Sequence, residues 1–272
     1  MDTSSPDVPN AKAVAAMSNI RTRFETPEDA YFGFFEADKA KDGDAWAAVM
    51  SYPHVRVAAS GQTECFNSPQ DYAAAADWTA REATGWAYTR GRDPVRLHES
   101  HDRVHLLGGW TRYNADDEPI LWNWVTYILT KPADCWGVQA RFAVGSYRYL
   151  GFDDVAAAEA AGEAAVGVVR SFYLALSQHN GKACADLCRF PMITVGVGEV
   201  LCSKDAGVLA GELSTVPEHL TGMRVNAVQC GARGAIVEVA ADFLTGGGER
   251  SVLIVGKRDD AWQIAGMSRM LT

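Results

Sequence analysis

The sequence has little of several features that would assign a protein class directly. No hydrophobic run approaches the ~20 residues that a membrane span requires, and Lys+Arg number 25 against 34 Asp+Glu, a net charge of -9. A nucleic-acid or anionic-membrane surface needs clustered Lys and Arg, so we expect neither as a partner. The first twenty residues lack the basic start and apolar core of a secretory signal, so we expect a cytoplasmic protein.

Cysteine and histidine are present but are not grouped as metal ligands. None of the six cysteines forms a Cys-x-x-Cys pair, and Cys184 and Cys188, four apart on one helix face, are interpreted as buried thiols. His98, His101 and His105 fall across a strand end and a turn, where residues at this spacing need not converge. A solvated turn is the favoured interpretation. We predict no metal site and no cofactor.

An internal repeat organises the chain. Residues 42–61 read as a short helix followed by a Tyr-Pro entry into a strand, and residues 180–198 have the same design. Aligning the two stretches places Tyr52-Pro53 on Phe190-Pro191 with a constant shift of about 138 positions. The 272 residues exceed the usual size of a single domain. We therefore predict one fold written twice.

The first copy reads as helices followed by long strands. Thr26-Pro27 supplies an N-cap and a first-position proline for a helix that breaks at Asp42-Gly43. A strand is expected at 54–58, a short one at 62–66, and a helix capped by Ser68 extends to about residue 78. Further strands are predicted at 86–99, broken by Gly91 and Pro94, and at 103–113, with a bulge or sharp bend at Gly108-Gly109. Two more are predicted at 120–130 and 136–147, and turns join these strands as in a curved antiparallel meander.

The second copy repeats this order. A helix-forming stretch from residue 153 leads to Asn180-Gly181, and strands are predicted near 199–202, 224–230, 235–244, 250–257 and 262–267. The predicted fold class is α+β, with helices packed into a strongly curved antiparallel sheet in each copy. We expect a frayed leader at 1–23, a first domain at 24–152 and a second, degenerate domain at 153–272.

These residues carry a family resemblance. The helices, the bent sheet and the closing hairpin with a turn-Trp-x-Val/Ile pattern, at Trp136-Gly137-Val138 and Trp262-Gln263-Ile264, resemble the NTF2-like (SnoaL-like, cystatin-like) superfamily. The segment Tyr52-Pro53-His54-Val55-Arg56-Val57 is similar to segments of its bacterial members. The resemblance implies a cone whose mouth admits a small molecule into an apolar cavity. The superfamily includes acid–base enzymes and non-catalytic binding proteins, so the fold does not choose between them.

One departure from the family pattern bears on chemistry. Isomerase-type members carry an acidic base on the first strand just before its turn, where this chain has Ala58-Ala59-Ser60-Gly61. A steroid-isomerase reaction is therefore disfavoured. Members of the family also place a neutral acid deeper in the cone, where this chain has Asn123-Trp124-Val125-Thr126-Tyr127 instead.

Four residues are the candidates for acid–base chemistry. His54 and Arg56 lie two apart and share a strand face, so an inward-facing pair would place an imidazole beside a fixed cation. If Val55 and Val57 face inward instead, both polar residues are at the surface. The resemblance to dehydratase-like relatives adds Tyr31 and Asp38 as helix-borne partners of the histidine, with Asp38 as a solvated helix residue as the alternative.

Aromatic and amide side chains complete the candidate ligand-binding set. Most of the rings in this aromatic-rich first sheet should fill the core or an interface. A subset is expected to line the pocket together with Arg56. The predicted ligand-binding residues are Arg56, Tyr113, Trp122, Asn123 and Trp124.

Two functions remain open from the sequence. One is a lyase, dehydratase or isomerase-type enzyme acting on a small hydrophobic substrate through His54, Asp38 and Tyr31. The other is a non-catalytic binding or scaffold protein. Because superfamily members pair through the outer sheet face, the resemblance implies that the second copy replaces a homodimer partner, making a pseudo-dimer within the chain. A further homodimer of the whole chain stays open.

Overall fold

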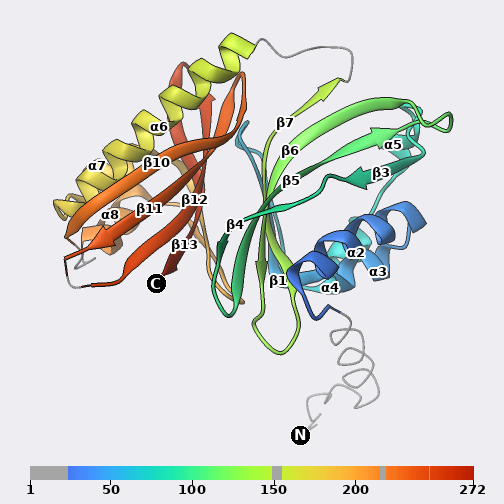
Figure 1. The fold of residues 1–272 in the computed structure, drawn as a ribbon, viewed down its shortest axis with the longest axis horizontal. Coiled ribbons are helices and arrows are strands. Elements are labelled where there is room, and N and C mark those ends of the chain that lie inside the picture. Colours follow the sequence, from blue (N-terminus) through green and yellow to red (C-terminus); the bar gives the residue numbers. More distant parts are fainter. Residues whose placement is uncertain (1–23, 149–154, 215–218, 245) are drawn as a thin grey trace, which may run out of the picture.

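The computed structural model describes residues 24–148, 155–214, 219–244 and 246–272, and these residues form two curved sheets that pack back to back (Figure 1). Each sheet carries helices on the face that is turned away from the other sheet. The proposed leader 1–23 and the proposed domain boundary at 152/153 lie outside the described residues. Among the described residues, no helix has the length and apolar character needed to cross a bilayer.

The first unit, residues 24–148, begins with helices and ends in long strands. Its elements are α2 (Pro27–Ala40), α3 (Gly43–Ala48), β1 (Met50–Ala58), β2 (Thr63–Phe66), α4 (Pro69–Ala74), α5 (Thr79–Glu82), β3 (Tyr88–Gly91), β4 (Val95–Glu99), β5 (Arg103–Tyr113), β6 (Pro119–Thr130) and β7 (Gly137–Arg148).

The second unit, residues 155–272, follows the same plan with one long first helix. Its elements are α6 (Val155–Ser177), α7 (Gly181–Asp186), β8 (Cys188–Val195), β9 (Val200–Ser203), α8 (Ala206–Ser214), β10 (Leu220–Gly231), β11 (Gly234–Phe243), β12 (Gly248–Arg258) and β13 (Ala261–Leu271).

The two sheets have the same topology. The first has the order β2-β1-β7-β6-β5-β3, and the second, read in the same direction, has the order β9-β8-β13-β12-β11-β10. In both, the strand after the short helix pairs in parallel with the last strand, Arg56 beside Arg141 and Thr194 beside Met267. The predicted α+β fold of two tandem units is confirmed.

Local signals explain why the helices begin and end where they do. Thr26 and Asp29 form a capping box at the start of α2, where Pro27 is the first helical residue. The helix ends at Lys41 in a left-handed conformation (φ 54°), and His179 does the same after α6 (φ 55°). Equivalent caps at equivalent positions are what a repeated fold requires. The Tyr52-Pro53 and Phe190-Pro191 bonds are both cis.

The predicted break of the segment 86–99 at Gly91 and Pro94 is confirmed, because the segment forms two short strands. β3 pairs with the far end of β5 and β4 with its near end. Pro94 between them has no N–H for a ladder. The predicted bend at Gly108-Gly109 lies opposite this break: Gly109 has φ 149°, and a Cβ there would lie 2.3 Å from the Asn123 carbonyl oxygen.

Three buried clusters hold the molecule together. One lies under the helices of each unit, and the third joins the outer faces of the two sheets. The members of this third cluster are Val55, Val57, Ala59, Ile128, Ala140, Phe142, Val144, Ile193, Val195, Ile236, Val252, Ile254 and Ala265.

Hydrogen bonds also connect the two units. Arg103 donates to the carbonyl oxygens of Val195 (3.2 Å) and Arg269 (2.6 Å), while Gln229 bridges Thr126 and the Gly108 carbonyl at 2.9 Å each. Stable protein interfaces commonly combine a buried apolar core with hydrogen bonds between polar groups.

Candidate functional site

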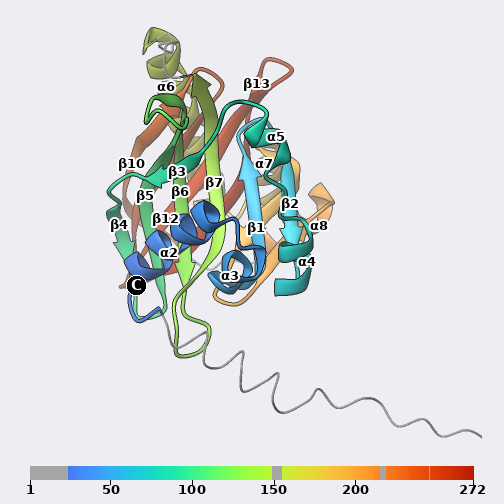
Figure 2. The same cartoon turned by 90° about the vertical axis from the view of Figure 1, so that its right-hand side faces the viewer.

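A cavity of about 590 Å³ lies on the inner face of the first sheet, between the strands and the helices that cover them. Figure 2 shows these helices in front of the sheet, on the side away from the second unit. Side chains of α2, α3 and α5 form one wall, and side chains of β1, β5, β6 and β7 form the other. The volume is in the range that holds a drug-sized molecule.

The apolar part of the lining is largely aromatic. Phe34 and Phe35 come from α2, Trp46 from α3 and Trp110 from β5, and Val125 of β6 also lines the cavity. Phe34 contacts Trp46 with ring centroids 5.3 Å apart. These rings offer flat surfaces to a ligand rather than a layer of flexible aliphatic chains.

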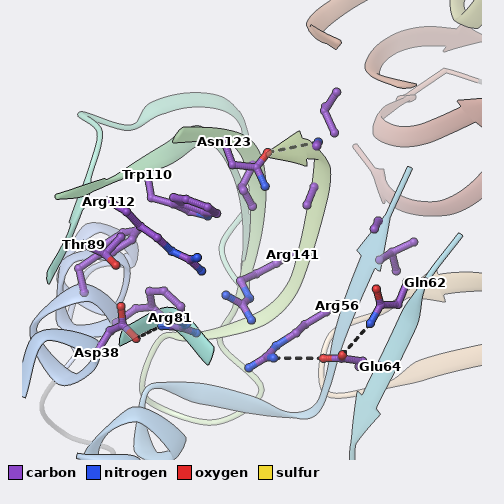
Figure 3. Close-up of a pocket in the computed structure, with 18 of the residues that line it drawn as sticks. Asp38, Arg56, Gln62, Glu64, Arg81, Thr89, Trp110, Arg112, Asn123 and Arg141 are labelled. Atoms are coloured by element: carbon purple, nitrogen blue, oxygen red, sulfur yellow. Dashed lines mark hydrogen bonds and ion pairs between the residues drawn. The ribbon is translucent and has the colours of Figure 1, made fainter. Parts of the chain in front are cut away.

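The polar part of the lining is dominated by arginine. Four guanidinium groups, Arg56, Arg81, Arg112 and Arg141, face two carboxylates, Asp38 and Glu64 (Figure 3). Two of the four are paired: Arg81 binds Asp38 at 2.5 Å and Arg56 binds Glu64 at 3.1 Å. Such an excess of positive charge is unexpected in a chain whose net charge is -9.

Arg112 and Arg141 are the other two, and neither has an ion-pair or hydrogen-bond partner within the part of the chain that the structure describes. Arg112 lies over Trp110 (4.7 Å) and Arg141 over Phe34 (4.8 Å), contacts that offset part of the cost of burial. Burial, then repulsion from Arg81, lowers the pKa of Arg112 to about 10. Burial also lowers the pKa of Arg141. Because a guanidinium group stays protonated in proteins, both side chains are cations.

Three of the predicted site residues line this cavity: Asp38, Arg56 and Asn123. Asp38 is 2% exposed, and its Oδ1 accepts hydrogen bonds from Arg81 and from the Trp78 indole (3.1 Å). The solvated alternative for Asp38 is therefore excluded.

His54 shares the inner strand face with Arg56, as one alternative held, but it does not line the cavity. It is fully buried, 5.3 Å from the Tyr72 ring. Its Nδ1 lies 2.7 Å from the Val138 carbonyl oxygen and must donate, so the neutral ring leaves Nε2 as the acceptor, without a partner among the described residues. Burial, with Arg141 and Arg56 nearby, holds the pKa of His54 well below its usual value.

Tyr31 also lies outside the cavity lining. Its hydroxyl donates to the carbonyl oxygens of Arg92 (2.7 Å) and Gly109 (3.0 Å), and burial raises its pKa. Of the three predicted catalytic residues His54, Asp38 and Tyr31, only Asp38 lines the cavity.

The three remaining predicted aromatics do not line the cavity either. Tyr113 stacks on Tyr88 with centroids 5.1 Å apart. Trp122 and Trp124 contact each other edge to face at 5.5 Å, and Arg92 lies over both rings. They were predicted because the first sheet is rich in aromatic residues. Successive side chains of a strand point to opposite faces of the sheet, and this alternation decides which face each ring occupies.

Arg81, Arg112 and Arg141 also line the cavity but were not predicted from the sequence. Arg141 alternates along β7 with Ala140 and Phe142, an arrangement typical of a strand with one wet face. Here both faces are covered, by the second sheet and by the helices. Arg141 lies beside Arg56 through the parallel pairing of β1 with β7, which the predicted meander did not contain, so no signal in the sequence analysis pointed to it.

The histidines at 98–105 are not a solvated turn. His98 and His105 pair across β4 and β5 with their Nδ1 atoms 3.1 Å apart, and both are buried against the second unit. His105 Nε2 contacts the Ser268 hydroxyl (2.9 Å). Only His101 is exposed. The interpretation failed because β4 packs on the interface between the sheets.

In the second unit, a buried polar network occupies the equivalent space. Glu249 is 0% exposed and accepts from the hydroxyls of Tyr173 and Ser251 and from Arg269. The strand registers match Glu249 to Asn123, Ser251 to Val125 and Arg269 to Ala143, and the repeat matches Tyr173 to Phe35. All four counterparts in the first unit line the cavity.

The arginines of the cavity have no counterpart in the second unit. In the same alignment Arg56 becomes Thr194, Arg141 becomes Met267 and Arg112 becomes Phe243. Met267 belongs to the buried cluster under α6, and Phe243 packs against it.

Solved structures similar to the chain are NTF2-like and cystatin-like proteins of unknown function. A cystatin-like domain from Nostoc punctiforme is 14% identical, with a TM-score of 0.36, covering 48% of this chain and 76% of its own. An NTF2-like protein from Silicibacter pomeroyi is 15% identical, with a TM-score of 0.32, covering 40% and 94%.

A third similar structure is a putative calcium/calmodulin-dependent protein kinase type II association domain from Thiobacillus denitrificans. It is 21% identical, with a TM-score of 0.35, covering 44% of this chain and 95% of its own. Each match spans about half of the chain. No protein-family model matches the sequence, and no curated protein does.

Proposed function

We propose that this chain is a small-molecule-binding protein whose first unit holds the ligand and whose second unit is structural. The observation that carries the proposal is the cavity of about 590 Å³ in the first unit, at the place where the second unit is filled by Tyr173, Glu249, Ser251 and Arg269. A pocket lined by aromatic rings and a few convergent polar groups is the usual form of a small-ligand site.

The contacts favour binding over acid–base catalysis. Of His54, Asp38 and Tyr31, only Asp38 reaches the cavity, and two donors already occupy its Oδ1. A general acid or base has to lie within hydrogen-bond reach of the reacting atom. The non-catalytic alternative therefore has the better support.

The role proposed for the second unit is that of an intramolecular partner. Its sheet covers the outer face of the first sheet through the third cluster, which would otherwise expose apolar side chains such as Val55, Ile128 and Phe142. In this proposal the chain is its own pseudo-dimer.

Filling the cavity tests the proposal. Ala143 lies on the cavity wall, at the position that matches Arg269 of the second unit. Replacing it with phenylalanine should fill the cavity as Arg269 fills the equivalent space. A thermal-shift screen with a library of small organic molecules should give compounds that raise the melting temperature of the wild-type protein. Those shifts should disappear in Ala143→Phe. Native mass spectrometry should show these compounds bound to the wild-type protein and absent from Ala143→Phe.

Ala115→Phe, in the exposed turn between β5 and β6, is the matched control and should keep the shifts. If the same compounds stabilise Ala143→Phe and the wild type equally, the ligand site lies elsewhere and the proposal fails.

A further inference from the structure

The cavity carries an excess of positive charge that nothing in the described chain neutralises. Arg112 and Arg141 are aimed into it without a hydrogen-bonding or ionic partner among the described residues, and Arg141 Nε is a buried donor left unused (Figure 3). Both side chains are half-buried, and an unpaired cation that has lost part of its water carries a cost that is recovered when an anion binds. The site is thus built to receive negative charge from outside the chain.

The second unit shows which kind of anion fits this position in the fold. There the carboxylate of Glu249 lies inside the sheet, bound by Arg269, Tyr173 and Ser251. The first unit has Asn123 at the matching position, so its own chain supplies no carboxylate there. The first unit has Ala143 at the position of Arg269, and the cation Arg141 lies two residues away on the same strand face.

The surrounding rings indicate what the anion is attached to. Trp110 and Phe34 lie against the two free guanidinium groups, and Phe35, Trp46 and Val125 also line the cavity. An inorganic ion would leave these apolar surfaces uncovered, whereas a flat organic body would bury them. Planar guanidinium groups match carboxylate oxygens in a two-point contact.

We propose that the ligand is an organic acid with a flat apolar body, whose carboxylate lies between Arg112 and Arg141 and takes the place that Glu249 holds in the second unit. This inference depends on the proposed function, since it names the ligand class of the same cavity.

A set of matched probes tests the ligand class by isothermal titration calorimetry on the full chain. 2-Naphthoate should bind, and 2-naphthamide, which has the same shape without the charge, should bind at least ten-fold more weakly. 2-Naphthyl phosphate should also bind more weakly than the carboxylate. Arg141→Gln and Arg112→Gln should each weaken 2-naphthoate roughly ten- to hundred-fold, the range for a hydrogen bond to a charged group. Arg90→Gln, an exposed arginine outside the cavity, should leave the affinity within two-fold.

A substitution that supplies the missing carboxylate tests its position. In Asn123→Glu, the introduced carboxylate should take the place of the ligand's carboxylate, so that 2-naphthoate no longer binds. The melting temperature of this variant should be higher than that of Asn123→Gln. The Gln variant has the same length without the charge, so the comparison isolates the carboxylate. A folded Asn123→Glu protein that binds 2-naphthoate as tightly as Asn123→Gln would overturn the assigned position.

The outcomes separate this inference from the proposed function. If the amide binds as tightly as the acid and both lose binding in Ala143→Phe, the cavity binds small molecules but the acid class is wrong. If the phosphate binds tightest, the anion is a phosphoryl group and the carboxylate assignment is wrong. If compounds that bind the wild type bind Ala143→Phe equally well, both proposals fail.

Discussion

His54 illustrates how burial changes the meaning of a polar residue. From the sequence, an imidazole two residues from an arginine is a catalytic candidate. In the structure, it is enclosed by Phe66 and Tyr72 and bonded to the Val138 carbonyl. The second unit has Met192 at the equivalent position, also fully buried. The ring therefore acts mainly as a packing group.

This gives a prediction for His54. His54→Ala should destabilise the protein by roughly 2–4 kcal/mol, because it removes a buried ring and leaves a cavity. His54→Met, the residue of the second unit, should cost clearly less because it refills the space. Urea unfolding measures both. A wild-type midpoint for His54→Ala would contradict the packing role.

At the level of single residues, the sequence could identify which positions are polar but not where they point. Asp38, Arg56 and Asn123 were named as candidates and line the cavity, although the sequence left open which strand face Arg56 occupies and whether Asp38 is solvated. Arg112 and Arg141 were missed because an arginine that alternates with apolar residues normally faces water. Covering of both sheet faces is a tertiary property that the strand itself does not encode.

Among the elements, α2 positions the largest share of the helical wall. It carries Phe34, Phe35 and Asp38 to the cavity, and its first turn depends on the capping box of Thr26 and Asp29. Both the cap and the proline after it were recognised in the sequence, because capping depends only on residues a few positions apart.

The cap gives a prediction for this helix. Thr26→Ala should lower the free energy of unfolding by about 1 kcal/mol, since it leaves the Asp29 backbone N–H without its side-chain acceptor. Thr26→Ser keeps the hydroxyl and should stay near the wild type in urea unfolding. Equal losses for the Ala and Ser variants would show that the capping oxygen is not what stabilises the first turn.

Strands were harder to predict than helix starts. In the segment 86–99, Gly91 and Pro94 predicted a break, but only the structure shows that the two parts pair with opposite ends of β5. The parallel pairing of β1 with β7 was likewise not predicted, because a meander of hairpins contains only antiparallel pairs. Pairing partners lie far apart in the sequence, so local patterns do not specify them.

At the scale of the whole molecule, the interface between the units contains buried histidines. His98 faces His105, and from the second unit it faces Glu238 (3.7 Å) with Arg224 and Arg250 nearby. Burial, despite the opposing effect of Glu238, lowers the pKa of His98 to about 4. Burial together with His98 and Arg103 holds the pKa of His105 well below its usual value.

These shifts predict that the protein is less stable in mild acid. The folded histidines stay neutral, while the unfolded chain takes up protons below about pH 6.5, so stability falls as the pH drops from about 6.5 towards 4. Urea unfolding at pH 7, 6 and 5 should show the decline. His105→Gln should reduce its slope by up to about 1.4 kcal/mol per pH unit.

His101→Gln, at an exposed side chain, is the control and should leave the slope unchanged. A slope that is the same in His105→Gln and the wild type would mean that other groups cause the acid sensitivity.

Joining the two sheets in one polypeptide removes a restriction that identical subunits would impose. In a homodimer, every amino-acid substitution occurs in both subunits, so a side chain that fills the cavity of one subunit also fills the cavity of the other. Here Arg269 and Glu249 close one hollow while Ala143 and Asn123 leave the other open. Covalent linkage thus allows the two units to carry different residues at equivalent positions, so that one position can be filled by side chains while the other lines a cavity.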